Sequence, residues 1–169
     1  MKILAIDTSS RCCSVMLTIG TGSFLCTEAT AVARTRHLLS YIDDLLTQNL
    51  IDPQSLDLLA WNAGPGSFTG LRIGASVIQA LAYSFNLPVQ PLSSLEVLAY
   101  AALRRRDSQL NGSTMVAVAQ DARMGGVYWA VFKIQRDSLE RLEPDQLLLA
   151  DRQSLAEMIG DDWLLVGDA

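Results

Sequence analysis

The chain has 169 residues, half of them apolar, with a net charge of −5 and a sequence isoelectric point near 4.7. This composition allows a sizeable core, while the acidic balance argues against a chain that binds nucleic acid on its own. No apolar run has the roughly 18 residues of a membrane span, and Asp7 interrupts the first apolar run too early for a signal peptide. We expect a cytoplasmic protein with no membrane partner.

The first part of the chain predicts alternating strands and helices. Three strands at residues 3–7, 13–19 and 23–28 are followed by a helix at about 34–49. A strand at 57–61 leads into a glycine-rich segment, a helix at about 69–85 and a short strand at 87–91. A further helix ends near Arg104–Arg106, and the turn QLNGS follows it. This turn divides the chain into predicted lobes at 1–110 and 111–169.

The second part repeats the order of the first. Strands are expected at 115–119, 127–134, 146–149 and 163–166, with a helix at 151–159. Two segments of the first part have similar counterparts in the second: ILAIDTSS resembles VAVAQDAR, and DLLAWNAG resembles DWLLVGDA. Such duplicated lobes fit an α/β fold of the actin-like type (ASKHA, ribonuclease H-like). The second lobe stops at Ala169 without the helix that follows the first, so we expect either a piece of a longer protein or a naturally short lobe.

Each lobe opens with an acidic turn, at Asp7 and at Asp121. In actin-like proteins these turns face a nucleotide, since turn N–H groups hold phosphate and an Asp holds the metal. The turn DTSSRCCS has no glycine for a close phosphate approach, and Arg123 is placed to pair with Asp121. Both features argue against nucleotide hydrolysis by this chain alone.

The segment WNAGPGSFTGLRIG has the strand, glycine loop and helix layout of a phosphate cradle. No lysine follows Gly70, which excludes a P-loop, and the glycine spacing is one residue too long for a dinucleotide fingerprint. The segment is also no serine-hydrolase elbow. It is either a structural corner or an anion or nucleotide site at a helix N-terminus. The candidate residues are Gly64, Gly66, Ser67, Thr69 and Gly70.

The helix that follows is apolar around most of its circumference. Its polar residues form one narrow wedge, and a helix apolar nearly all round is a buried helix. One side should pack on its own sheet, so the other side needs a second cover, either a partner chain or a further part of this chain. The wedge consists of Arg72, Ser76, Gln79 and Tyr83.

Metal-binding and redox motifs are missing from the sequence. The cysteines, Cys12, Cys13 and Cys26, include no Cys-x-x-Cys pair, and His37 is the single histidine. This pattern fits neither a zinc site nor a disulfide framework, so no metal is expected. The cluster Arg104–Arg106 is interpreted as a solvated helix end.

Three segments closely resemble the TsaB (YeaZ) family of bacteria: LAIDTS at 4–9, GPGSFTGLRIG at 64–74 and DARMGGVYWA at 121–130. The resemblance implies an actin-like fold and a role in making N6-threonylcarbamoyladenosine in tRNA. It implies a non-catalytic subunit that binds the paralogous transferase TsaD together with the ATPase TsaE, and that also pairs with itself. It leaves tRNA contact to the complex and marks Asp7, Thr8, Asp121 and Arg123 as vestigial phosphate-loop positions.

The same resemblance implies an interface on the helices of the first lobe, with ATP or ADP at a subunit boundary as an open possibility. Ile78→Glu is expected to break association while leaving the fold intact. The alternative function is a stand-alone actin-like ATPase or kinase, or a glycoprotease-like peptidase. The expected interface residues are Leu38, Leu39, Ile42, Leu71, Arg72, Ile73, Ala75, Ser76, Ile78, Gln79, Ala82 and Tyr83.

Overall fold

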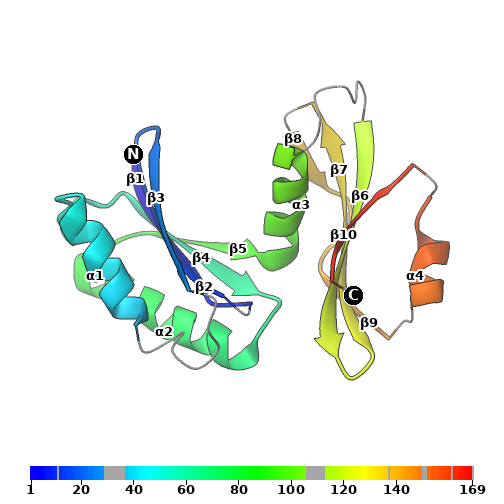
Figure 1. Ribbon diagram of the computed structural model, residues 1–169, viewed down its shortest axis with the longest axis horizontal. Helices are drawn as coiled ribbons and strands as arrows, with labels where there is room; N and C mark the ends of the chain where they lie inside the picture. The colour runs from blue at the N-terminus through cyan, green and yellow to red at the C-terminus, as the bar shows by residue number, and fades with distance from the viewer. Residues whose placement is uncertain are drawn as a thin grey trace. The chain divides into compact units, whose positions relative to one another are not determined.

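The computed structural model describes residues 1–10, 12–28, 37–105, 113–136, 138–149, 152–160 and 162–168. The chain forms two compact units, Met1–Ser93 and Ser94–Ala169 (Figure 1). Each unit has its own five-stranded sheet and its own apolar core. The two units are therefore described one at a time.

The sheet of the first unit has the order β3-β2-β1-β4-β5. β1, β2 and β3 form an antiparallel meander, whereas β4 runs parallel to β1 and β5 runs parallel to β4. The parallel pairs require crossover connections, which the helices supply. The strands are β1 (Lys2–Asp7), β2 (Cys13–Ile19), β3 (Gly22–Glu28), β4 (Leu58–Gly64) and β5 (Val89–Ser93).

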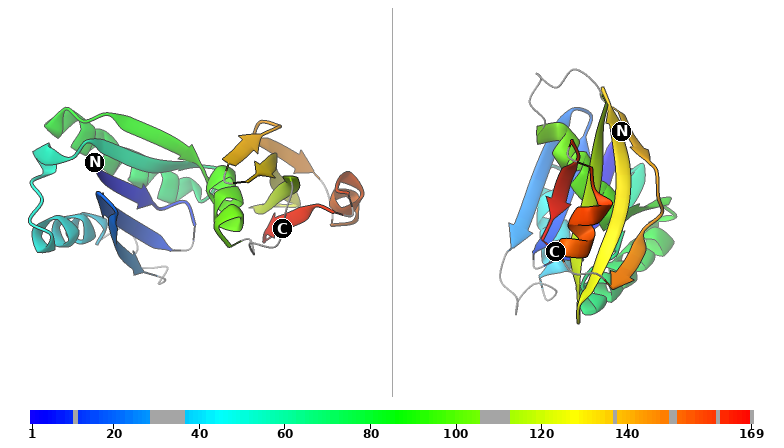
Figure 2. Two further views of the ribbon diagram at one scale, coloured as in Figure 1. Left: turned by 90° about the horizontal axis from the view of Figure 1, so that it is seen from above. Right: turned by 90° about the vertical axis from the view of Figure 1, so that its right-hand side faces the viewer.

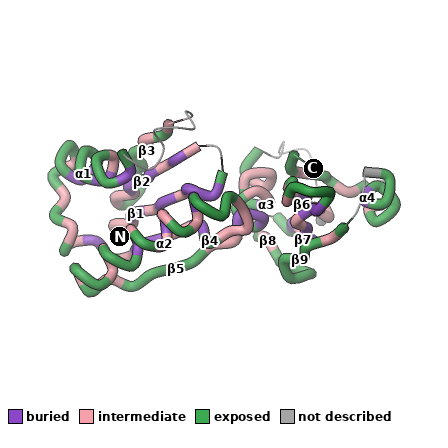
Figure 3. Tube along the Cα trace, turned by 90° about the horizontal axis from the view of Figure 1, so that it is seen from below, coloured by how far each residue is buried: buried purple, intermediate pink, exposed green. Residues whose placement is uncertain are grey.

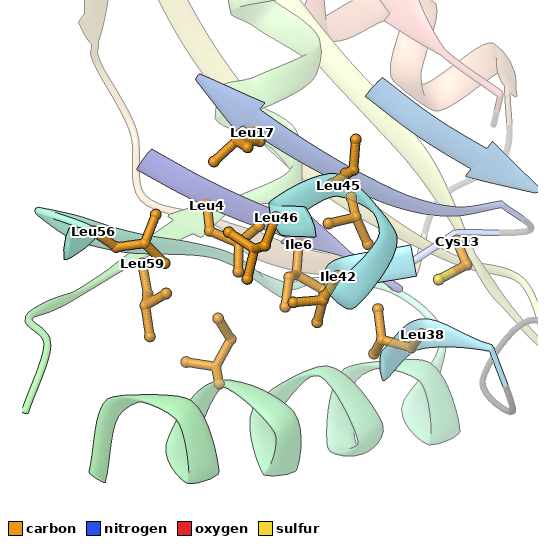
Figure 4. Packing of buried hydrophobic residues seen from close by; sticks show 12 residues of the cluster. Leu4, Ile6, Cys13, Leu17, Leu38, Ile42, Leu45, Leu46, Leu56 and Leu59 are labelled. Carbon is orange, nitrogen blue, oxygen red and sulfur yellow. The ribbon is translucent and has the colours of Figure 1, made fainter. Parts of the chain in front are cut away.

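Two helices, α1 (Leu38–Gln48) and α2 (Phe68–Phe85), pack on one face of this sheet, and a short 3-10 helix, η1 (Pro53–Ser55), precedes β4. Alternate residues of the strands point to the helices, as the period of a strand requires. Figure 4 shows these side chains meeting those of α1 in one layer above α2. The core cluster consists of Leu4, Ile6, Cys13, Val15, Leu17, Leu38, Ile42, Leu45, Leu46, Leu56, Leu59 and Ile78.

The sheet of the second unit has the order β10-β6-β7-β8, and β9 pairs with the first half of β7. β6 and β7 form a long antiparallel hairpin, and β10 runs parallel to β6. The elements are α3 (Ser94–Arg105), β6 (Ser113–Arg123), β7 (Gly126–Gln135), β8 (Ser138–Arg141), β9 (Gln146–Leu149), α4 (Arg152–Met158) and β10 (Leu164–Gly167).

Helices α3 and α4 lie on opposite faces of the second sheet (Figures 1 and 2). Leu95 and Ala99 of α3 are fully buried against one face, where Phe132 is also fully buried. Leu155 of α4 packs on the other face, where Trp129 is 1% exposed. The second sheet therefore has a separate apolar core on each side.

The element types agree with the sequence prediction, apart from β8 and η1, which were not expected. The predicted first helix started at residue 34, but residues 29–36 lie outside the described part of the chain, and α1 begins at Leu38. The two units divide at Ser93–Ser94 rather than at 110–111, because α3 packs on β6 and β7. No helix in the described ranges has the length and apolar character needed to span a membrane.

Candidate functional site

The glycine-rich segment between β4 and α2 packs against the backbone of the turn between β1 and β2. A Cβ atom on Gly70 would lie 1.9 Å from the carbonyl oxygen of Thr8, and one on Gly66 would lie 2.5 Å from that of Ser9. A Cβ on Gly74 would lie 2.5 Å from the Thr8 hydroxyl oxygen. The close approach of two backbones therefore requires glycine at positions 66 and 70, whereas Gly74 leaves room for the side chains of Thr8 and Trp61.

Hydrogen bonds join the same two segments. The Thr8 hydroxyl donates to the carbonyl of Gly70 over 2.8 Å, and the Ser67 N–H donates to the carbonyl of Ser9 over 2.7 Å. The Ser67 hydroxyl accepts the N–H of Gly70 and caps α2, which confirms one of the two predicted capping residues. Gly64 has a φ of +106°, a backbone conformation that favours glycine. The segment therefore forms a tight corner at the start of α2.

Asp7 is held at the end of β1 by three donors of the protein itself. One carboxylate oxygen accepts the Ser9 N–H at 2.8 Å and the Ser9 hydroxyl at 2.7 Å. The other accepts the side-chain amide of Asn62, which is 5% exposed, at 2.9 Å. The Asn62 amide oxygen in turn accepts the N–H of Gly64. The carboxylate of Asp7 thus ties the first turn to the glycine-rich corner.

Asp121, near the turn between β6 and β7 in the second unit, also accepts a hydrogen bond from a neighbouring residue, as Asp7 does, but it is exposed. Asp121 accepts the N–H of Arg123 at 2.7 Å, and its other oxygen lies 3.8 Å from the Arg123 guanidinium. Asp168 accepts the N–H of Asp121 at 3.0 Å. The predicted pairing of Arg123 with Asp121 is confirmed. Asp7 and Asp121 belong to different units, and each is bound by its own neighbours.

Exposed residues of α2 recur as a stripe along one side of the helix, and the buried ones lie on the opposite side. Figure 3 colours α2 as a mixture of exposed, intermediate and buried residues. The stripe contains the predicted polar wedge, of which Tyr83 is 92% exposed. The helix is less buried than its apolar sequence predicts, because only Gly70, Gly74 and Ile78 are fully enclosed. A large part of α2 is therefore available to another molecule.

A hollow of about 500 Å³ lies beside this stripe, between α2 and the strands β4 and β5. The small side chains of Ala75 and Ala82 leave room for it, and Gln79 and Tyr83 supply its polar atoms. The lining has no charged residue, so it suits an apolar group better than a phosphate. The lining residues are Trp61, Ala75, Ile78, Gln79, Ala82, Tyr83, Val89 and Pro91.

The structure sorts the predicted interface residues into three groups. Leu38, Ile42 and Ile78 are 0%, 4% and 2% exposed and belong to the core, so they support the helices from within and do not reach the surface. Leu71, Ile73, Ala75 and Ala82 are half-buried along α2. The exposed members are Leu39, Arg72, Ser76, Gln79 and Tyr83.

Sequence reasoning missed three contributions to this region. Phe68 is 68% exposed, and the guanidinium of Arg72 lies 3.6 Å from the centre of its ring. The contact could have been predicted, because Phe68 directly follows the capping serine and precedes Arg72 by four residues, which places both on one side of the helix. Asn62 and the β5 residues that line the hollow act through contacts distant in sequence.

No group of three or more metal-ligating side chains occurs in the described ranges.

Comparison with known proteins relates the chain to one pathway. The family model described as TsaD, tRNA N6-adenosine threonylcarbamoyltransferase, matches residues 28–160. The Escherichia coli tRNA threonylcarbamoyladenosine biosynthesis protein TsaB is 35% identical over 99% of this chain and 71% of its own length. The Haemophilus influenzae protein of the same name is 38% identical, with 77% of this chain and 53% of that protein covered.

A solved structure agrees with this relationship. YeaZ from Pseudomonas aeruginosa superposes with a TM-score of 0.83 and 32% identity, over 98% of this chain and 75% of that one. The match extends through both units and confirms the predicted actin-like α/β fold class. The sequence identity, the length of the match and the shared fold all agree with the predicted family. The chain belongs to the TsaB (YeaZ) family.

Proposed function

We propose that the chain is the non-catalytic subunit required for N6-threonylcarbamoyladenosine formation in tRNA, and that it binds and activates the transferase TsaD together with the ATPase TsaE. The observation that carries this proposal is the packing of the glycine-rich corner against the first acidic turn. Backbone atoms of Thr8 and Ser9 occupy the space beside Gly66 and Gly70 that a phosphate cradle would keep open. Asp7 is engaged by protein donors at the same place.

The exposed stripe of α2 and its hollow form the surface that we assign to TsaD. The stripe offers neutral polar groups and one cation, and the hollow offers an apolar recess next to them. A specific protein interface usually has an apolar centre and a polar rim. Because the family model of TsaD also matches this chain, the partner is a paralogue with related helices. The same surface would serve pairing with a second copy.

The remaining parts of the proposal concern ligands and location. We assign any bound ATP or ADP to a boundary with another subunit and not to the hollow, whose lining has no charged side chain for phosphate. The chain meets tRNA within the complex and acts in the cytoplasm, where tRNA is modified.

Reconstitution tests the function directly. TsaD, TsaE, threonylcarbamoyl-AMP, ATP and tRNA are combined with and without the full-length protein, and modified adenosine is measured. We expect modification only when the protein is present, and no modification by the protein alone. Equal modification without it would remove the proposed role.

A surface variant tests the interface. Ser76→Glu places a charge at the middle of the exposed stripe, so we expect it to abolish co-elution with TsaD in gel filtration. Thr21→Glu adds the same charge to an exposed turn between β2 and β3 and should leave co-elution unchanged. Unchanged binding by Ser76→Glu would place the interface elsewhere.

The alternative function, a stand-alone ATPase or peptidase, is decided by a separate measurement. Steady-state hydrolysis of ATP, or of a peptide library, by the purified chain would favour it. The expected result is no turnover above the level of an Asp7→Asn variant, which keeps the size of the side chain.

A further inference from the structure

Three arginines gather at one end of the second unit. Arg104 and Arg105 form the last turn of α3, and Arg136 follows the last residue of β7. Leu103 packs on the apolar cluster that contains Ile134, which brings the end of α3 next to the end of β7. Figure 1 shows the end of α3 and the end of β7 at the same, upper end of the second sheet. We call Arg104, Arg105 and Arg136 the basic end.

Four other cationic side chains in the described residues contact a polar, aromatic or acidic group. The Lys2 ammonium donates to Ser55, Arg72 stacks on Phe68, and Arg123 pairs with Asp121. Arg141 pairs with Glu96 and Asp145. Lys133 is half-buried and has Glu140 opposite it in the β7–β8 register, with no ion pair among the described residues. Within the described residues, the members of the basic end are exposed and have no ion pair or hydrogen bond through their side chains. Among the described residues, the exposed cations that have neither a polar nor an aromatic contact are thus concentrated in one place.

Helix electrostatics explain only part of this arrangement. Arg104 and Arg105 favour the negative end of the α3 dipole, as cations do in a last helical turn. Arg136 belongs to another element and adopts a φ of +51°, a conformation that suits glycine or asparagine better than arginine. The dipole of α3 therefore accounts for two of the three arginines, and the third comes from a separate element of the second unit.

We infer that the basic end contacts the phosphodiester backbone of tRNA when the chain is part of the modification complex. Guanidinium groups bind phosphate oxygens in a bidentate manner, and such contacts orient a protein on nucleic acid without reading its sequence. This inference rests on the proposed function, which brings tRNA to the complex. An acidic surface of a partner protein has the same charge preference, and the test below separates the two.

The acidic balance of the whole chain agrees with a local contact. With a net charge of −5, the chain has no general affinity for RNA, so three arginines can add to binding by other subunits but cannot replace it. The contribution should therefore appear as a change in the affinity of the complete complex and in its dependence on salt. It should be small or absent for the isolated chain.

The experiment measures tRNA binding by the complex of the full-length protein with TsaD at several salt concentrations. We expect Arg104→Gln/Arg105→Gln/Arg136→Gln to weaken binding at least about tenfold at low salt and to reduce the slope of log K against log salt by about 2 to 3. Arg123→Gln is the matched control for Arg136→Gln, because Arg123 is the last residue of β6 and Arg136 follows β7, and both have a positive φ, +67° and +51°. Arg123→Gln should leave both quantities unchanged.

Each outcome has a distinct meaning. If the wild-type complex modifies tRNA and the triple variant binds tRNA with unchanged affinity and salt slope, the inference is wrong. If the triple variant loses TsaD in gel filtration without tRNA, the basic end belongs to a protein interface, and the inference is also wrong. If the wild-type protein has no effect on modification at all, the proposed function itself fails.

Discussion

The hydroxyl of Thr8 donates a 2.8 Å hydrogen bond to the carbonyl of Gly70, and no side chain separates the two backbones. Thr8 is 4% exposed, so this bond is shielded from water. It connects the first turn of the sheet to the first turn of α2. The orientation of α2, and with it the proposed partner surface, depends on this contact.

Gly70→Ala should destabilise the first unit strongly. The new Cβ would lie 1.9 Å from the carbonyl oxygen of Thr8, and only movement of one backbone could relieve the overlap. Overpacking of this kind should lower the free energy of unfolding by about 3 kcal/mol, which is toward the upper end of the usual range. The free energy of unfolding in urea measures the loss.

The control for this variant is Gly22→Ala. A Cβ on Gly22 would have its nearest contact at 3.6 Å, the carbonyl oxygen of Ile19, which is an ordinary distance. We expect a change within about 0.5 kcal/mol. Equal stabilities of the two variants would show that the corner is not packed as described.

Ile78→Glu should unfold the first unit, contrary to its use as an interface probe. Ile78 is 2% exposed in the core cluster between α2 and the sheet, where a carboxylate would have no water. The expected cost is about 4 kcal/mol or more, because a charge would be buried without a partner. Ser76→Glu, two residues earlier on the exposed side, should change stability by no more than about 0.5 kcal/mol.

Circular dichroism and urea unfolding of these two variants distinguish the core from the surface of α2. A folded Ile78→Glu protein with normal stability would contradict the assignment of Ile78 to the core. Loss of TsaD binding by Ile78→Glu alone would reveal nothing about the interface, because the fold is lost with it.

The local elements could be predicted from sequence because their periodicity is strong. The helix at 69–85 was expected from its apolar residues and its capping serine, and α2 spans Phe68–Phe85. β8, with the sequence SLER, has no such pattern and was missed. Its place in the sheet comes from pairing with β7, which a local pattern does not contain.

Contacts between distant segments explain the remaining differences. The segment QLNGS predicted a lobe boundary and lies largely outside the described residues. Leu95 and Ala99 are buried on the second sheet, so α3 belongs to that unit. The sequence of the glycine-rich corner was equally compatible with a ligand site and with a structural turn. The contact that favours the turn joins residues 8 and 70, and no motif spans that separation.

Tyr41 should make stability depend on pH in the alkaline range. Its hydroxyl donates to the Glu28 carboxylate at the end of β3, and this hydrogen bond, with some burial and the nearby negative charge, raises the pKa of Tyr41 to about 12. The folded state favours the neutral phenol. The Tyr41 hydroxyl therefore makes its full contribution to the free energy of unfolding below about pH 10, the ordinary pKa of tyrosine. It is lost as the pH rises toward 12.

Comparison with Tyr41→Phe measures this effect, since phenylalanine keeps the ring and removes the hydroxyl. The stability difference between the two proteins should be constant from pH 7 to about 9.5 and should shrink above it. Absorbance at 295 nm should show one fewer late-titrating tyrosine in the variant. A difference that is independent of pH would contradict the hydrogen bond to Glu28.

Arg141 should couple α3 to β8 through its ion pair with Glu96. The two groups are 3.1 Å apart, and the guanidinium also pairs with Asp145 and lies 4.8 Å from the centre of the Phe132 ring. Burial lowers the pKa of Arg141, but its hydrogen bonds to Asp145 and Glu96 outweigh this and raise it overall. Arg141→Ala should therefore cost more than Glu96→Ala, because it removes all three contacts.

A double-mutant cycle of these alanine variants isolates the pair. Because the side chains are 30% and 51% exposed, solvent screens the interaction, and we expect a coupling free energy of about 0.5–1 kcal/mol. The coupling should decrease in 1 M NaCl, where the Debye length falls to about 3 Å. Additive losses would show that Glu96 and Arg141 do not interact in solution. In that case α3 would be held on the second sheet by the packing of its apolar side chains, among them Leu95 and Ala99.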